Sequence, residues 1–93
     1  MGSTLYLPVK AVYFHAIAAG TKTEEYRLVT PYWRKRLVHR LYDTLVLTLG
    51  YPQRLDAKKR IELPYCGYVI KTITHPHFGP AAVTVFAINV SKP

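Results

Sequence analysis

The segment GTKTEEYR, residues 20–27, contains the side chains of this sequence that are best suited to chemistry. The chain has only five acidic residues, yet two of them, Glu24 and Glu25, lie between Lys22 and Arg27. If the segment is a strand, alternation sends Glu25 and Arg27 to one face and leaves Glu24 on the other as a surface charge. Lys22, at the junction with a preceding helix, can reach the same end. Three charged groups are therefore expected to converge.

Two interpretations of this convergence follow from its chemistry. Lys22 and Arg27 alone would attract any phosphate, whereas a carboxylate between them orients both cations and accepts hydrogen bonds from a base or amine edge. In that case the cations supply attraction and Glu25 supplies selectivity. The alternative is a purely structural ion pair between Glu25 and one of the cations.

A second group of cations lies on an expected helix from Pro31 to about Tyr42. Thr30 suits the N-cap, and Pro31 suits the first helical position. At about 100° per residue, apolar side chains cover one side of this helix and basic ones the other. The apolar side comprises Trp33, Leu37, Val38 and Leu41. Because charged faces commonly just contact water, phosphate binding is one of two interpretations for the basic candidates Lys35, Arg36 and Arg40.

Aromatic side chains near the motif offer stacking surfaces for bases, and the candidates are Tyr26, Tyr65 and Tyr68. Tyr65 and Tyr68 are three positions apart in one expected strand, so they point to opposite sides. The sequence leaves open which of the two faces a cleft. The loop over residues 50–60 carries a further basic cluster, formed by Arg54, Lys58, Lys59 and Arg60.

Other patterns argue against metals, cofactors and membranes. His75 and His77 are two positions apart in a loop without a nearby carboxylate or cysteine, which falls short of a metal site. The single cysteine, Cys66, excludes an internal disulfide and multi-thiolate zinc sites, and it favours a reducing cytoplasm. No apolar run approaches the roughly 20 residues of a membrane span, and the N-terminus lacks signal-peptide features. We therefore expect no metal or cofactor, no membrane association and a cytoplasmic location.

The charge balance indicates an anionic partner. The 93 residues include 13 Lys and Arg against 5 Asp and Glu, which gives a net charge of +8 and a pI near 9.8. Such a surface attracts polyanions, although charge alone does not distinguish RNA from DNA or an anionic membrane. The length suits one domain over residues 1–93, with one core and little room for large catalytic machinery.

The elements that position these residues are indicated by hydrophobic spacing. Residues 4–8 suit a strand that stops at Pro8, residues 9–19 suit a helix, and Gly20 suits the left-handed position that follows it. Further strands are expected over residues 22–29, 44–49, 63–73 and 82–90. The order favours an α+β fold, in which about five strands curl into a small β-barrel flanked by the two helices.

The pattern G-x-K-x-x-E-x-R, filled by Gly20, Lys22, Glu25 and Arg27, resembles the signature of the ASCH domain family. The preceding strand with LPVK, the short apolar helix before the glycine and the final hydrophobic strands extend this resemblance over roughly residues 5–90. It implies a PUA-like β-barrel, a cleft beside the barrel lined by the motif, and RNA or nucleotide binding as the usual role.

Some family members resemble enzymes, so two alternatives to a binding module stay open. One is a small hydrolase acting on RNA or a modified nucleoside, with Lys22, Thr23 and Glu25 as catalytic candidates. The family branch that is an amidohydrolase on N4-acetylcytidine has threonine where this chain has Glu25. Thr23 lies two positions away, which counts against the same chemistry. The other alternative is a basic accessory protein that binds another protein and leaves RNA untouched.

Overall fold

The computed structural model describes residues 3–50 and 59–91, which form an α+β fold as expected. Within those ranges there are six strands, two α-helices and a short 3₁₀ helix, η2. In chain order they are β1 (Thr4–Val9), α1 (Ala11–Ala18), β2 (Glu24–Leu28), α2 (Pro31–Leu37), β3 (Thr44–Leu49), β4 (Arg60–Pro64), β5 (Tyr68–His75), η2 (Pro76–Phe78) and β6 (Gly79–Asn89).

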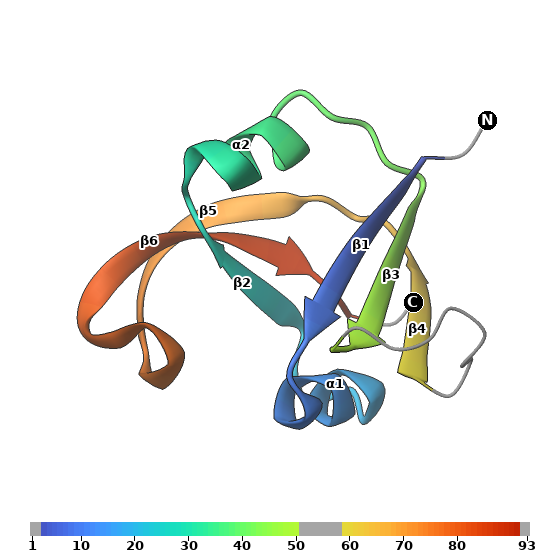
Figure 1. Ribbon diagram of the computed structural model, residues 1–93, viewed down its shortest axis with the longest axis horizontal. Helices are drawn as coiled ribbons and strands as arrows, with labels where there is room; N and C mark the ends of the chain where they lie inside the picture. Colours follow the sequence, from blue (N-terminus) through green and yellow to red (C-terminus); the bar gives the residue numbers. More distant parts are fainter. Residues whose placement is uncertain (1–2, 51–58, 92–93) are drawn as a thin grey trace.

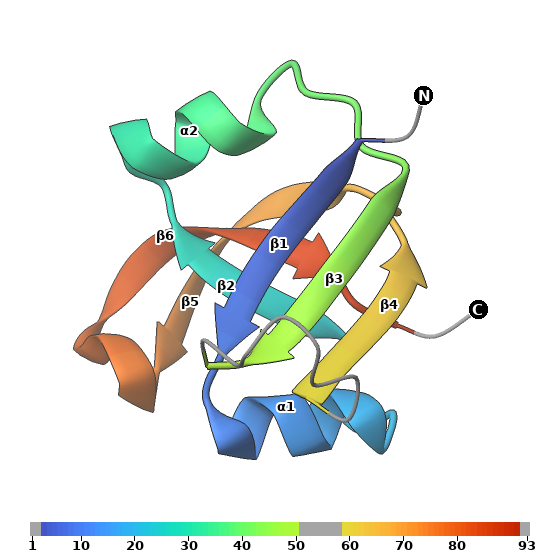
Figure 2. The same cartoon turned by 45° about the vertical axis from the view of Figure 1, so that its right-hand side comes forward.

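The strands form two three-stranded sheets. In the first, β3 lies between β1, which is parallel to it, and β4, which is antiparallel. In the second, β6 lies between β2 and β5, and both pairings are antiparallel. The two sheets face each other, with α1 at one end of the space between them and α2 at the other (Figures 1 and 2). Among the described residues the strands pair within these sheets and not around one closed barrel.

The hydrophobic core lies between the sheets and is built by strand alternation. In β1, Leu5 and Leu7 point inward and are at most 5% exposed, whereas Tyr6 between them is 60% exposed. Both sheets and both helices contribute, so core packing fixes the elements that carry the charged motif. The buried cluster comprises Leu5, Leu7, Val9, Phe14, Ile17, Leu37, Leu45, Leu47, Leu63, Phe86, Ile88 and Val90.

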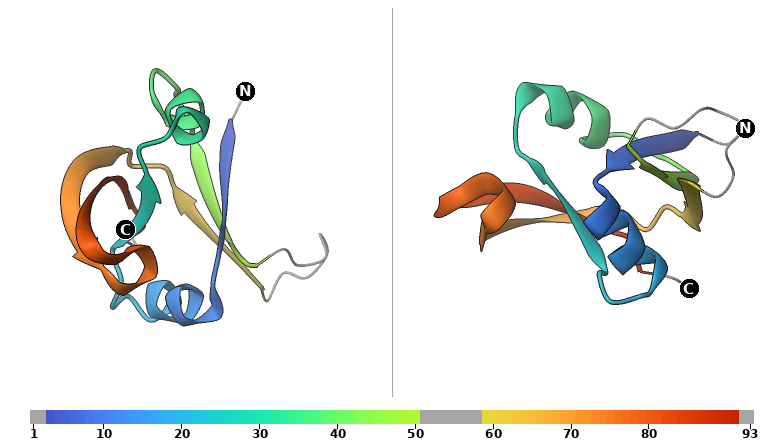
Figure 3. Two further views of the ribbon diagram at one scale, coloured as in Figure 1. Left: turned by 60° about the vertical axis from the view of Figure 1, so that its left-hand side comes forward. Right: turned by 60° about the horizontal axis from the view of Figure 1, so that its bottom comes forward.

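The strand expected over residues 63–73 is in fact two strands in different sheets. β4 ends at Pro64 and β5 begins at Tyr68, and Gly67 just before β5 has a φ of 84°. Proline lacks the N–H that a ladder needs, and glycine readily adopts a positive φ, so the chain changes sheets here. Six strands therefore replace the expected five. The hairpin of β5, η2 and β6 curves away from the space between the sheets (Figure 3).

The second helix begins as predicted but ends early. Thr30 is its N-cap, and its hydroxyl accepts a hydrogen bond of 3.3 Å from the backbone N–H of Trp33. The helix ends at Leu37, and Val38 has an extended backbone. Leu41 is consequently 93% exposed, so its predicted place on the apolar side of a longer helix is wrong.

Side chains beyond α2 explain its early end. The Arg40 guanidinium donates to the carbonyl of Lys35, and the Tyr42 hydroxyl donates to the carbonyl of Arg36. These carbonyls lie in the last helical turn, where they would otherwise lack partners. His39 adopts a left-handed conformation with a φ of 58°, which turns the chain away from the helix axis.

Three smaller features complete the comparison with the expected elements. β1 continues through Pro8 instead of stopping there, because β1 is an edge strand and an edge position tolerates a missing N–H. Arg54 and Lys58 of the predicted basic loop lie outside the described residues, whereas Arg60 begins β4. In the part of the chain that is described, no helix is long and apolar enough to cross a membrane.

Candidate functional site

Lys22 is positioned by the turn that ends α1. Gly20 has a φ of 81°, as predicted for the residue after the helix. The backbone N–H groups of Thr21 and Lys22 both donate to the carbonyl of Ala16, at 3.0 and 3.2 Å. These bonds close the helix end and direct the chain into β2, with the Lys22 side chain next to it.

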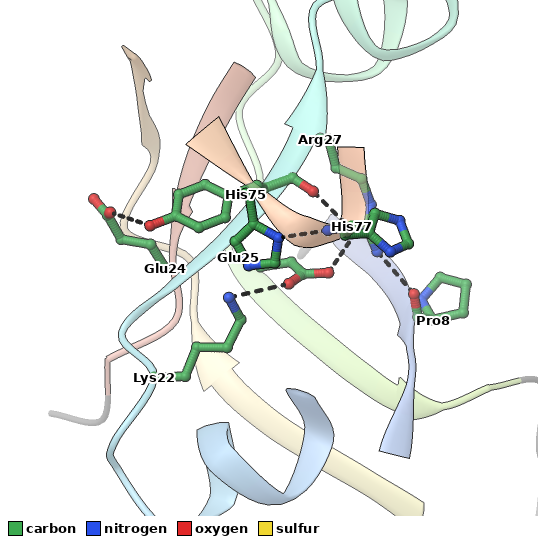
Figure 4. A network of polar contacts seen from close by, with 8 residues as sticks. Pro8, Lys22, Glu24, Glu25, Arg27, His75 and His77 are labelled. Atoms are coloured by element: carbon green, nitrogen blue, oxygen red, sulfur yellow. Dashed lines mark hydrogen bonds and ion pairs between the residues drawn. The ribbon is translucent and has the colours of Figure 1, made fainter. Parts of the chain in front are cut away.

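Glu25 is a buried carboxylate at the centre of the motif, with a relative exposure of 4%. Its Oε1 is 3.7 Å from Nζ of Lys22, and its Oε2 forms a hydrogen-bonded ion pair with the guanidinium of Arg27. A buried charge is tolerated only when it is paired in this way. Figure 4 shows the three side chains pointing toward one another, which confirms the predicted convergence. We refer to Lys22, Glu25 and Arg27 as the charged cluster.

Arg27 links the two sheets. Its second terminal nitrogen donates to the carbonyl of Pro8 in β1 at 2.7 Å, and its guanidinium lies 5.3 Å from the ring centroid of Trp33 in α2. The Pro8 carbonyl lies on the free edge of β1, where it has no strand partner among the described residues, and Arg27 supplies the hydrogen-bond donor that it needs. Because Glu25 pairs with the same guanidinium, the ion pair of Glu25 and Arg27 has a structural role in joining the two sheets.

Lys22 is paired with Glu25 without a hydrogen bond between them. Its distance of 3.7 Å from Glu25 exceeds the roughly 3.2 Å of an N–H···O hydrogen bond. The ammonium lies over two aromatic rings, 5.1 Å from the centroid of Tyr13 and 4.7 Å from that of Tyr26. These cation–π contacts hold the ammonium between the two rings.

A large groove opens beside the charged cluster, with a volume of about 960 Å³. It lies between α2 and the adjoining edges of β1 and β2, and Arg27 is part of its wall. Cations and aromatic rings dominate its lining, and among the described residues no carboxylate contributes to it. The residues that line the large groove are Tyr6, Pro8, Tyr26, Arg27, Leu28, Thr30, Tyr32, Trp33, Arg36, Thr48, Arg60, His77 and Phe78.

A small hollow of about 190 Å³ adjoins the large groove and contains the whole charged cluster. The two spaces share Pro8, Tyr26, Arg27, His77 and Phe78. Figure 4 shows His75 and His77 beside the charged cluster, where the Nδ1 of His75 accepts from the backbone N–H of His77 at 3.1 Å. The small hollow is lined by Pro8, Val9, Lys10, Tyr13, Lys22, Glu25, Tyr26, Arg27, His75, His77 and Phe78.

The predicted basic candidates on α2 separate in the structure. Arg36 lines the large groove, and its guanidinium stacks 3.4 Å from the ring centroid of Tyr32. Lys35 is exposed and lines neither space, and Arg40 lies beyond the end of the helix. Only Arg36 of the three is therefore brought near the charged cluster.

Two of the tyrosine candidates lie elsewhere. Tyr65 packs against the core and against Tyr42, with ring centroids 5.3 Å apart, and burial raises the pKa of its hydroxyl. Tyr68 packs edge-on against Phe86 at 4.9 Å. Tyr68 and Thr23 line a third hollow, of about 250 Å³, which contains no member of the charged cluster. Tyr26 is the aromatic candidate that reaches both the large groove and the small hollow.

Glu24 points away from the charged cluster, as alternation predicts, but it has a partner of its own. Both of its carboxylate oxygens accept from Nζ of Lys71 in β5, at 2.7 and 2.8 Å. This hydrogen bonding lowers the pKa of Glu24 and raises the pKa of Lys71. The Tyr26 hydroxyl also donates to Glu24, and its pKa is raised first by burial and then by this bond.

Sequence reasoning missed several residues of both spaces. The sequence pattern of His75 and His77 suggests at most metal ligands, and the described residues contain no group of three or more side chains able to hold a metal ion. Tyr13, Tyr32 and Phe78 also line these spaces and carry no motif that would single them out in the sequence. The one available signal was the density of aromatic and histidine residues on both sides of the motif. These residues come together only through the fold.

In comparisons with protein-family models, with curated proteins and with solved structures, nothing matches this chain. The resemblance to the ASCH family therefore rests on the motif and the order of elements alone.

Proposed function

We propose that this protein binds RNA or a nucleotide through the large groove, with the charged cluster at one side of it. The observation that carries the proposal is the lining of the groove. Three arginines, Arg27, Arg36 and Arg60, line it together with several aromatic side chains, and the lining side chains among the described residues include no carboxylate. Single-stranded nucleic acids are bound by this combination, since cations track the backbone while rings stack on the bases.

Within this proposal Glu25 has a different role from the one expected for it. Both of its oxygens face cations, and only 4% of the residue is exposed. A ligand therefore meets Lys22 and Arg27 first, and Glu25 acts by holding them in place. The net charge of +8 draws the anion toward the groove.

We further propose that the fold is an opened version of the PUA-like barrel implied by the ASCH resemblance. The contact between Arg27 and Pro8 supports this, because it joins β2 to β1 where continuous strand pairing would close a barrel. A cytoplasmic location is part of the same proposal and rests on the single cysteine.

Binding is preferred over hydrolysis for a geometric reason. A hydrolase built on a threonine nucleophile needs Thr23 beside Lys22, and Thr23 lines a different hollow from Lys22. Arginine and aromatic side chains are also common at protein interfaces, so the salt dependence of RNA binding is what separates a nucleic acid from a protein partner.

The test is fluorescence anisotropy with a labelled single-stranded RNA over a series of salt concentrations. We expect affinity to fall steeply with salt, and Arg36→Ala to weaken binding and reduce the slope of log K against log salt by about 0.7, the value for one phosphate contact on a single strand. The matched control is Arg34→Ala, because Arg34 is exposed on the same helix and lines neither space. Salt-independent binding, or equal effects of the two changes, would contradict the proposal.

A further inference from the structure

The small hollow differs from the large groove in size and in its walls. Its volume of about 190 Å³ compares with about 960 Å³ for the groove, and ligand pockets commonly hold roughly 300–1,000 Å³. Residues from β1, α1, β2, β5 and η2 surround it, among them Tyr13 and His75. The space suits one small chemical group better than a chain that continues through it.

The charges around the small hollow favour an anion with more than one charge. Lys10, Lys22 and Arg27 line it, against the single carboxylate of Glu25, which leaves two positive charges in excess. Arg27 already directs three of its five N–H donors to Glu25, the Tyr26 carbonyl and the Pro8 carbonyl. The ammonium of Lys22 is beyond hydrogen-bond distance from Glu25, and Lys10 is exposed, so both have donors to offer.

Terminal and internal phosphates differ in the property that this arrangement would detect. A phosphate monoester carries about −1.5 to −2 charges near pH 7 and has three acceptor oxygens, whereas a diester within a strand carries one charge. Two cations with unused donors therefore favour the monoester. The small hollow shares lining residues with the large groove, including Arg27 and His77, so a chain attached to a group in the hollow would continue into the groove.

We propose that the small hollow binds a terminal phosphate monoester, while the large groove holds the nucleotides attached to it. Lys10 and Lys22 contact the phosphate, and Glu25 keeps Lys22 beside it. The inference rests on the proposed function, since it specifies which part of a nucleic acid or nucleotide enters which space. Both the end of a phosphorylated strand and a free mononucleotide carry such a phosphate monoester.

The experiment compares single-stranded RNAs of one sequence that differ only at their ends: 5′-phosphate, 3′-phosphate, hydroxyl at both ends, and a circular form. We expect one of the two phosphorylated forms to bind roughly tenfold more tightly than the hydroxyl and circular forms, the effect of about one charge-assisted hydrogen bond. Competition with a nucleoside monophosphate and with inorganic phosphate shows whether the bound phosphate belongs to a strand end or to a free nucleotide. A mononucleotide that competes as well as the phosphorylated strand identifies a free nucleotide as the ligand.

Variants show which residues cause the preference. Lys10→Ala and Lys22→Met should each reduce it severalfold, whereas Arg34→Ala, which also removes one positive charge, should leave it unchanged. Lys10 is exposed and its side chain has no part in the core, so Lys10→Ala tests the inference even if Lys22→Met fails to fold. Equal binding of all four RNAs would overturn this inference and leave the proposed function standing. Failure of every RNA and nucleotide to bind would overturn both.

Discussion

Glu24 and Glu25 are adjacent carboxylates in very different surroundings. Glu25 is 4% exposed and faces two cations, while Glu24 meets Lys71 at the surface. Glu25→Gln keeps the shape of the side chain but leaves two partly desolvated cations without a counter-charge. We expect it to lower the free energy of unfolding by about 3 kcal/mol, as for removal of one partner of a buried pair. Urea denaturation followed by the fluorescence of Trp33, the single tryptophan, measures the loss.

The matched control for that prediction is Glu24→Gln. Either change removes one negative charge and raises the net charge from +8 to +9, so general charge effects cancel. An exposed pair contributes under about 1 kcal/mol, and we expect no larger loss for Glu24→Gln. Similar losses for the two variants would mean that the interior pairing of Glu25 contributes no more than an ordinary surface contact.

At the scale of elements, the end of α2 is where sequence spacing and structure disagree most clearly. Leu37 is 1% exposed and Leu41 is 93% exposed, although both would lie on the apolar side of one longer helix. We expect Leu37→Ala to lower the free energy of unfolding by about 2–4 kcal/mol. Leu41→Ala should change it by no more than about 0.5 kcal/mol. Thermal or urea unfolding of this leucine pair decides between the two helix lengths, because equal losses would favour the longer one.

The ion pair of Glu24 and Lys71 connects β2 to β5 across the intervening strand β6. Because the pKa of Glu24 is lowered from its ordinary 4.5, the carboxylate stabilises the fold above pH 4.5, and this contribution is lost as pH falls through the lower folded-state pKa. The pKa of Lys71 is raised from 10.5, so its contribution is present below pH 10.5 and is lost at higher pH. The pair therefore stabilises the sheet between these limits.

An NMR titration tests this arrangement directly. We expect the carboxyl group of Glu24 to titrate below 4.5 in the unaltered protein and to move upward in Lys71→Met, because hydrogen bonding from Lys71 is the main cause of the lowered pKa. Arg34→Met removes a positive charge elsewhere and should leave the titration of Glu24 where it was. If the pKa of Glu24 were unchanged in Lys71→Met, the pair of Glu24 and Lys71 would not connect the two strands.

Local features of the elements could be predicted and non-local ones could not. The turn at Gly20 and the cap at Thr30 depend on residues within one helical turn, and both are present as predicted. The end of α2 depends on Tyr42 and Arg40 folding back onto the helix, which spacing does not encode. The division of residues 63–73 between two sheets had a visible signal in Pro64 and Gly67, but hydrophobic alternation on both sides concealed it.

At the scale of the whole molecule, the contrast between local and non-local features also explains which parts of the site could be predicted. Glu25 and Arg27 are two residues apart on one strand, so their shared face follows from strand geometry alone. The partners that complete the site come from distant segments: the Pro8 carbonyl is 19 residues from Arg27, and His77 is 50 residues from it. Which of Lys35, Arg36 and Arg40 reaches the groove is likewise decided by how α2 docks, and not by the composition of its basic face.

The net charge of the molecule and the contacts of its groove should affect the proposed RNA binding through different rate constants. Arg34→Glu lowers the net charge from +8 to +6 without touching either space, so we expect slower RNA association at low salt and an almost unchanged dissociation rate. Arg36→Ala removes a groove contact and should mainly speed dissociation. Stopped-flow measurements at two salt concentrations separate the two effects, because screening weakens the first much more than the second. If Arg34→Glu accelerated dissociation as much as Arg36→Ala, the bound RNA would have to contact the outer face of α2, and the groove would not be its main site.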